Sequence, residues 1–191
     1  MYTDNEQFDK INYTLTPFTK GEYEECTFTN CDFSHCNLAG CKFVECTFIH
    51  CNLSVVKFTD TALREVHFKN CKMLGVRFDE CAEFGFSVSF EGCILNMSSF
   101  FKCKLNKTTI TNSQLRETDF TECDLTSAVL DNCDFAAAIF ERTILDTADL
   151  RTSFNYALDP ERNRIKKAKF TTPGVLGLLA KYDIEIDKGK G

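Results

Sequence analysis

Apolar side chains recur at every fifth position along most of this 191-residue chain. Between Cys26 and Leu53 the sequence reads CTFTN, CDFSH, CNLAG, CKFVE, CTFIH and CNL, so each block begins with cysteine and carries Phe or Leu two positions later. A period of five matches neither the 3.6 residues of an α-helical turn nor the alternation of a β-strand. Because self-similarity at a fixed period is typical of repeat architectures, the pattern predicts a solenoid.

The five-residue register runs in two stretches that are out of phase. The central apolar position recurs from Phe18 to Phe78 and again from Phe90 to Leu150, and a small residue stands two positions before it. The gap of twelve between Phe78 and Phe90 equals two repeats plus two extra residues. We therefore predict a small bulge or loop over residues 79–89, either a tolerated insertion or a functional loop. Its candidate contact residues are Glu83, Phe84 and Phe86.

The ends of the chain lie outside the clearest repeats. Residues 1–15 are predicted to cap the first coil, because an open solenoid end exposes core and unpaired backbone. Residues 16–154 are predicted to form the repeat region. Residues 155–191 are predicted to form a helical tail, in which PGVLGLLAKY has an apolar helical face and Ile184 and Ile186 alternate as in a short strand.

Twelve cysteines raise the question of a metal site or a disulfide framework. Their separations within each half of the chain are multiples of five, and no CxxC pair occurs. A zinc site needs four ligands that converge on one point, whereas a phased column spreads them along an axis. We therefore expect no metal and no cofactor, and interpret the cysteines as small buried hydrophobes of a protein in a reducing, cytoplasmic compartment. A redox-sensing role stays open as an alternative, and rapid labelling of native thiols would favour it.

The net charge of −6 is unevenly placed. Residues 155–191 hold 8 Lys and Arg against 5 Asp and Glu, which leaves 14 of the 22 bases and 23 of the 28 acids, a balance of −9, in residues 1–154. This sign argues against direct binding of nucleic acid, since phosphate contacts need a basic surface. No apolar run approaches the ~18 residues of a membrane span, so no membrane partner is expected.

The sequence holds no recognisable catalytic motif. It lacks a phosphate-binding glycine loop and the GxSxG and HExxH patterns. The three histidines, His35, His50 and His67, fall at outward positions of the repeat. We therefore predict that the protein is not an enzyme and that its function lies on the outer faces, in the loop or in the tail.

The most uneven charge lies in residues 117–150, which hold nine acids and one base, Arg142. Four of the acids occupy the position where the repeat takes Asp or Asn for hydrogen bonding in turns. The other five are free choices of sign, so we predict an acidic surface that attracts a basic groove of a partner protein. The nine candidates are Glu117, Asp119, Glu122, Asp124, Asp131, Asp134, Glu141, Asp146 and Asp149.

The blocks CDFSH, CNLAG, TDFTE, CDLTS, CDFAA and ADLRT resemble the repeat of the pentapeptide-repeat family, usually written A(D/N)LXX. The resemblance covers about residues 16–152. It implies an all-β fold, a right-handed quadrilateral β-helix in which four repeats make one coil, closed by a short C-terminal helical cap. In that fold the central Phe or Leu points inward and stacks on its counterpart in the next coil.

The tail, LDPERNRIKKAKF followed by GVLGLLAKYDIEI, resembles the C-terminal segment of Qnr-type quinolone-resistance proteins and microcin-immunity proteins. That resemblance implies a homodimer joined end to end. It also implies a DNA-mimicking rod that binds a type II topoisomerase, DNA gyrase or topoisomerase IV, and protects it from quinolones or peptide toxins. The alternative is a protein–protein interaction scaffold for a different partner. The predicted dimer interface comprises Val175, Leu176, Leu179, Tyr182, Ile184 and Ile186.

Overall fold

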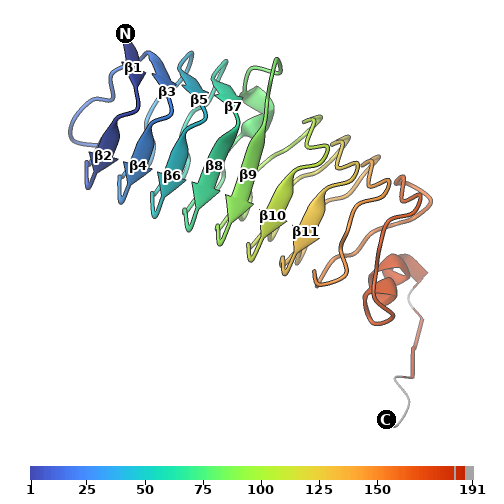
Figure 1. Ribbon diagram of the computed structural model, residues 1–191. Coiled ribbons are helices and arrows are strands. Elements are labelled where there is room, and N and C mark those ends of the chain that lie inside the picture. Colours follow the sequence, from blue (N-terminus) through green and yellow to red (C-terminus); the bar gives the residue numbers. More distant parts are fainter. Residues whose placement is uncertain (183, 188–191) are drawn as a thin grey trace.

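The computed structural model describes residues 1–182 and 184–187 and forms one elongated parallel β-solenoid, with the first strands and the C-terminal helices at opposite ends of the rod (Figure 1). Its strands belong to two parallel sheets, one with the order β1-β3-β5-β7 and one with the order β11-β10-β9-β8-β6-β4-β2. The strands are β1 (Tyr2–Asp4), β2 (Gln7–Asp9), β3 (Glu22–Glu24), β4 (Thr27–Thr29), β5 (Lys42–Val44), β6 (Thr47–Ile49), β7 (Ala62–Arg64), β8 (Val66–Lys69), β9 (Val88–Glu91), β10 (Thr109–Thr111) and β11 (Val129–Asp131).

Neighbouring coils are offset by twenty residues, as in the pairing of Phe8 with Phe28. Two further columns of isolated bridges run beside the sheets, one through Asp32 and Asn52 and one through Asn37. We name the four walls A (the four-stranded sheet), B (the seven-stranded sheet), C (the column through Asp32) and D (the column through Asn37). Four repeats of five residues therefore make one coil, and the predicted four-walled β-helix is confirmed.

The predicted register break lies between the 3-10 helix η1 (Phe78–Glu80) and β9. Across it the offset is 22 residues, as Val66 pairs with Val88, and the next coil returns to an offset of twenty. The two extra residues are therefore confirmed. They fall where wall A would continue beyond β7, so the loop ends the four-stranded sheet, and the wall resumes where Lys104 bridges to Asp124.

Stacked side chains from the central position of each repeat fill the interior. On wall D the rings of Phe78, Phe100 and Phe120 stack with centroids 4.6 and 5.4 Å apart and nearly parallel planes. Rings on neighbouring walls meet edge to face, as Phe120 meets Phe135 at 63°. Parallel stacking within a column and edge contact between columns are both favourable arrangements of aromatic pairs. One large side chain in each repeat therefore packs against the columns on both sides.

Where the small residue two positions before the central one is Cys, Ser or Thr, it often supplies a hydrogen-bond donor as well as a good fit. Thr143 Oγ1 donates to the carbonyl oxygen of Phe120 at 2.8 Å. Cys71 Sγ donates in the same way to the carbonyl oxygen of Phe48 at 3.3 Å. Thiols and hydroxyls thus fill one role, which explains why Cys, Ser and Thr alternate at this position. The sequence pattern predicted the size of these side chains and missed their hydrogen bonds.

A residue in the left-handed backbone region stands at nearly every corner, two positions after the central residue. It is often a residue with a Cβ, such as Asn30 at φ 53° and Val55 at φ 56°, and more rarely glycine, such as Gly75 at φ 63°. For a residue with a Cβ this conformation costs about 1–2 kcal/mol. The corners are therefore imposed by the stacking of the coils rather than by local preference.

The last coil is completed by helices. The predicted helical cap consists of η2 (Gly174–Leu178) and η3 (Ala180–Tyr182), which are 3-10 rather than α-helical. Bridges from Ile144 to Arg164 and from Asp149 to Lys169 extend walls A and B to the same level. Pairing therefore extends on both sides of residues 16–154, since β1 and β2 already pair with the second coil. Every helix in the described part of the chain is too short or too polar to cross a lipid bilayer.

The corner geometry predicts opposite effects for two exchanges on wall C. Val55→Gly should raise the free energy of unfolding by roughly 1 kcal/mol, because a β-branched residue is strained at positive φ and glycine is not. Gly75→Val, one coil further, should lower it by a similar amount, because a Cβ there meets nothing within 4 Å and the loss is conformational. Urea unfolding of both variants measures the difference. Equal signs for the two exchanges would contradict this account.

The donor role of the small position predicts a cost for losing a hydroxyl. Thr143→Val keeps the side-chain shape but removes the hydrogen bond to Phe120, and should lower the free energy of unfolding by about 1 kcal/mol. Thr143→Ser keeps the donor and serves as the control, although it also loses a methyl group. The prediction, read from chemical denaturation, is wrong if the valine variant is as stable as the wild type.

Candidate functional site

The cysteine thiols lie in the wall of the rod. Nine of the twelve are buried, and Cys36, Cys81 and Cys103 are partly buried. Burial raises the pKa of Cys46 to about 12 and that of Cys133 to about 11, so their reactive thiolate forms are scarce at neutral pH. Within residues 1–182 and 184–187, no three His, Cys, Asp or Glu side chains are placed to hold a metal ion. A binding site is therefore to be expected on the exterior.

The loop at the register break has the most defined geometry on the exterior. Phe84 is 81% exposed, yet the guanidinium carbon of Arg64 lies 5.2 Å from the centre of its ring. Gly85, at φ +74°, packs against the same arginine, since a Cβ there would lie 3.1 Å from Arg64 Nε. Phe86 packs against the core and anchors the loop. The loop therefore presents one exposed aromatic ring beside the guanidinium group of Arg64.

An ion pair holds the other side of this loop. Glu83 and Lys104 lie 2.6 Å apart, and the hydrogen bond from Lys104 lowers the pKa of the Glu83 carboxyl. A surface hollow of about 500 Å³ lies beside the pair. The three predicted loop residues are thus brought together, whereas Arg64 and Lys104 were missed. Arg64 and Lys104 lie about twenty residues before and after the loop residues. Counting one coil in each direction from the loop is the only sequence signal that could have revealed them.

The nine acids predicted in residues 117–150 are not brought together. Asp119 lies in the bridge column of wall D, Asp124 in that of wall A, Asp134 in that of wall C and Asp149 in that of wall B. Each of these four carboxylates accepts a hydrogen bond from the backbone N–H two residues later, at 2.8 to 3.2 Å. The predicted turn role of this position is therefore confirmed, and the acids face all four sides of the rod.

Five of the nine acids are neutralised by bases on neighbouring coils or within the same turn. Of these bases, only Arg142 lies inside the acidic segment, so a window of contiguous sequence missed the rest. Glu117, Asp119, Asp124 and Asp131 make no ion pair among the described residues. The acidic surface is therefore weaker and more scattered than the sequence suggested. The pairs are Glu122 with Lys102 and Arg142, Asp134 with Arg116, Glu141 with Arg162, Asp146 with Arg164, and Asp149 with Arg151 and Lys169.

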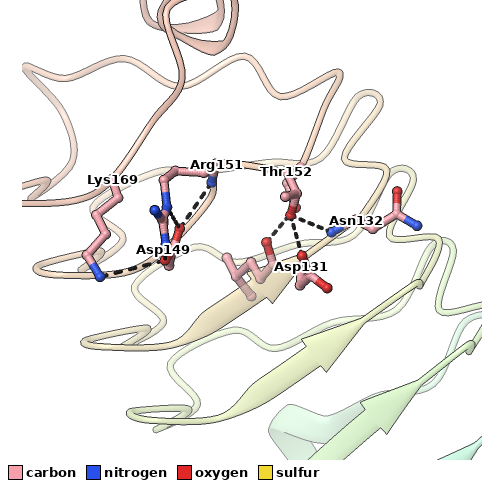
Figure 2. Close-up of polar contacts among 8 residues, drawn as sticks. Asp131, Asn132, Asp149, Arg151, Thr152 and Lys169 are labelled. Carbon is pink, nitrogen blue, oxygen red and sulfur yellow. Dashed lines mark hydrogen bonds and ion pairs between the residues drawn. The ribbon is translucent and has the colours of Figure 1, made fainter.

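Figure 2 shows how closely one of these carboxylates is held on wall B. Arg151 contacts Asp149 with Nε at 2.9 Å and Nη2 at 2.7 Å, and Lys169 Nζ lies 3.6 Å away. The hydrogen bond from Arg151, which outweighs the opposing effect of burial, lowers the pKa of Asp149 to about 2. This carboxylate is therefore ionised at neutral pH and occupied by its own cations.

Next to this group a second polar cluster lines a hollow. Thr152 Oγ1 donates to Asp131 at 2.6 Å and accepts from the Asn132 N–H at 2.8 Å (Figure 2). The hollow has a volume of about 390 Å³, and its floor includes Val129 and Leu130. Its polar groups already bond to one another, so it is a shallow recess of the wall rather than a prepared ligand site.

The predicted dimer residues lie at the C-terminal end of the rod. Val175, Tyr182, Ile184 and Ile186 are between 39% and 55% exposed, while Leu176 and Leu179 are partly buried. Apolar side chains exposed together at one end are consistent with a contact surface. The pairing of two tails stays a prediction.

Comparison with known proteins identifies the family of these repeats and solved structures with a similar fold. The family described as "Pentapeptide repeat region" matches residues 7–83, and "Pentapeptide repeats (8 copies)" matches residues 113–151. No curated protein sequence matches the chain. Two trypsin-treated forms of QnrB1, a plasmid-mediated fluoroquinolone resistance protein, are 17% and 20% identical with TM-scores of 0.63 and 0.55, and each match covers 98% of this chain and 100% and 98% of theirs.

A third solved structure has a different biological setting. HetL, a pentapeptide repeat protein involved in heterocyst differentiation regulation from the cyanobacterium Nostoc sp. strain PCC 7120, is 12% identical with a TM-score of 0.54. That match covers 88% of this chain and 84% of HetL. At such identities the structural matches establish the fold.

The lowered pKa of Asp149 predicts acid-dependent stability. The pKa is about 2 in the folded protein and about 3.9 in an unfolded chain, so the stabilisation is present above pH 4 and is lost as the pH falls towards 2. Asp149→Asn should therefore lower the melting temperature at pH 7 and have less effect at pH 2.5. Glu117→Gln is the control, because Glu117 is exposed and unpaired among the described residues. A difference that stays constant with pH would contradict this assignment.

Proposed function

Because the chain belongs to the pentapeptide-repeat family, we propose that it is a non-catalytic binding protein that docks onto the DNA-binding surface of a type II topoisomerase such as DNA gyrase. The observation that carries the proposal is the exposed Phe84, with Arg64 over its ring, on a rod whose interior is filled. The likeness in fold to QnrB1, described as a fluoroquinolone resistance protein, supports the choice of partner. The expected outcome of binding is protection of the enzyme from quinolones.

The loop is the specific contact in this proposal. Binding energy at protein interfaces concentrates in a few anchored residues, and aromatic side chains are enriched among them. Phe84 fits this description, because its ring is exposed and the guanidinium group of Arg64 already lies over it in the free protein. That contact restricts the ring before a partner covers it, which reduces the side-chain entropy lost on binding.

Charge supplies the less specific part of the attraction. The balance of −9 over residues 1–154 draws the rod towards a basic groove that normally receives nucleic acid. The ion pairs described above remove much of the field around residues 122–149. The carboxylates left for a partner in the predicted segment are Glu117, Asp119, Asp124 and Asp131, and of these Glu117 and Asp131 are exposed. Negative charge therefore acts on approach, and the loop determines the fit.

The test is gyrase supercoiling in the presence of a quinolone, with increasing concentrations of the purified protein. We expect supercoiling to recover. Phe84→Ala should raise the concentration for half recovery by about tenfold or more, as for an interface anchor. Phe154→Ala is the matched control, since Phe154 is also exposed but lies on wall C. Glu117→Lys combined with Asp131→Lys should weaken protection mainly at low salt.

The result that contradicts the proposal is equally concrete. Absence of any effect on supercoiling at tens of micromolar would exclude gyrase as the partner, since even weak binding is visible at such concentrations. If Phe84→Ala and Phe154→Ala raised the concentration for half recovery by the same factor, the loop would not be the specific contact.

A further inference from the structure

The N-terminal end of the rod is an open coil. The carbonyl oxygen of Glu24 accepts a hydrogen bond from the N–H of Asn5, in the preceding coil. The counterpart of Glu24 in the first coil is Asp4, its partner in register. Because alternate residues of a parallel strand bond to opposite neighbours, the backbone groups of Asp4 point along the rod axis, away from the molecule. On wall B, Gln7 and Asp9 likewise lie in the first coil, and their backbone groups point away from the molecule in the same way.

On walls A and B the C-terminal end is open in the complementary sense, whereas η2 packs against the rest of that end, where the Leu158 N–H donates to the Gly177 carbonyl oxygen at 3.0 Å. The N–H of Thr147 donates to the carbonyl oxygen of Lys166, in the following coil. Lys167 is the counterpart of Thr147 one coil later and has nearly the same φ, 59° against 60°. Its N–H therefore points out of the free end of the rod. The N-terminal end thus presents the backbone donors and acceptors that a preceding coil would bind, and the C-terminal end presents those that a following coil would bind.

Both ends also present apolar side chains that are covered on one side only. Phe8, Tyr13 and Phe18 at the N-terminal end are partly buried and pack against the core. Ile165 and Phe170 do the same at the C-terminal end. Inside the rod the same positions are covered on both sides. The ring of Phe28, for example, stacks on that of Phe8 at 4.7 Å and on that of Phe48 at 4.8 Å.

The two ends match in register on walls A and B. Wall A begins with Tyr2, paired with Glu22, and ends with Arg164, paired with Ile144. A second copy that continued this column would place its Tyr2 after Arg164 and its Asp4 after Lys166. On wall B the same shift places Phe8 of that copy on Phe170. A lysine then meets a carboxylate, and one aromatic ring meets another.

The charges of the two ends are opposite. Residues 1–25 hold six acids and two bases, whereas residues 162–182 hold six bases and no acid. Four of those bases pair with acids of their own molecule, namely Arg162, Arg164, Lys169 and Lys181. Among the described residues, Lys166 and Lys167 therefore carry the unpaired positive charge of this end. Stacked coils of this protein already pair opposite charges in this way, as Lys42 with Glu22 and Lys69 with Glu91 at 3.1 Å. Contact between an N-terminal and a C-terminal end would repeat the pattern between molecules.

We propose that the C-terminal end of one copy docks on the N-terminal end of a second copy, so that the β-helix continues from rod to rod. Such a contact is heterologous and produces an open chain of molecules rather than a closed dimer. The tail-to-tail pairing implied by the Qnr resemblance would instead bring Lys166 and Lys167 of two ends together. Head-to-tail stacking places Lys166 beside Asp4 and completes the ladder hydrogen bonds of walls A and B at both ends.

Sedimentation velocity of the full chain tests this assembly. The mean mass should rise with protein concentration and fall as salt is added, because the contact depends on opposite charges. Asp4→Lys and Lys166→Glu should each weaken association by about fivefold or more, since each replaces an attraction with a repulsion. Lys57→Glu is the matched control, because Lys57 is exposed in the middle of the rod. Melting temperatures establish that the variants remain folded.

Mixing the two end variants gives the most specific result. Asp4→Lys retains a native C-terminal end and Lys166→Glu a native N-terminal end. An equal mixture should therefore associate again, because one of its two contacts is native and the other only exchanges the two charges. The double variant should associate with itself again. A wild type that stays monomeric at every concentration would overturn the proposal. So would a dimer that Asp4→Lys leaves intact, because that outcome identifies tail-to-tail pairing.

Discussion

The stacking of each repeat on its counterpart one coil later is the constraint on which the rest of the structure depends. It closes the parallel ladders on walls A and B, aligns the phenylalanine rings, and places each small side chain beneath a carbonyl oxygen that it can hydrogen-bond. It also holds corner residues such as Val55 in a conformation that they do not favour alone. The stacking therefore outweighs local preference throughout the described coils, and a five-residue pattern becomes a rod.

The same offset governs the exterior electrostatics. Residues five apart lie on different walls, whereas residues about twenty apart are neighbours, so the charges that interact are distant in sequence. Asp146 is paired by Arg164, and Glu141 by Arg162. A segment rich in acids is consequently neutralised by bases of the next coil. The surface offered to a partner is better described by the exposed and unpaired carboxylates than by the composition of any segment.

Function and assembly are to be expected where the stacking constraint is interrupted. The loop after η1 interrupts wall A and presents Phe84, with Arg64 over its ring. The two ends interrupt the ladders of walls A and B and leave backbone groups and apolar side chains there without a neighbouring coil. The proposed contact with a topoisomerase uses the first kind of interruption, and the proposed assembly of rods uses the second. The two proposals concern different surfaces and can be tested separately.

The sequence by itself determined that the chain is a solenoid, because each repeat obeys one local rule, a small and a large inward side chain at fixed spacing. The four-walled coil followed from the resemblance of these repeats to a known family. The sequence also located the two extra residues near the loop, since a phase shift is visible without coordinates. Only the tertiary structure decided which charges survive, because the partners of Glu122, Asp134 and Asp149 come from other repeats. It likewise showed that the guanidinium group of Arg64 lies over the Phe84 ring and that the tail forms 3-10 helices. Such contacts depend on which coil lies beside which, and a five-residue pattern does not encode that for the exterior side chains.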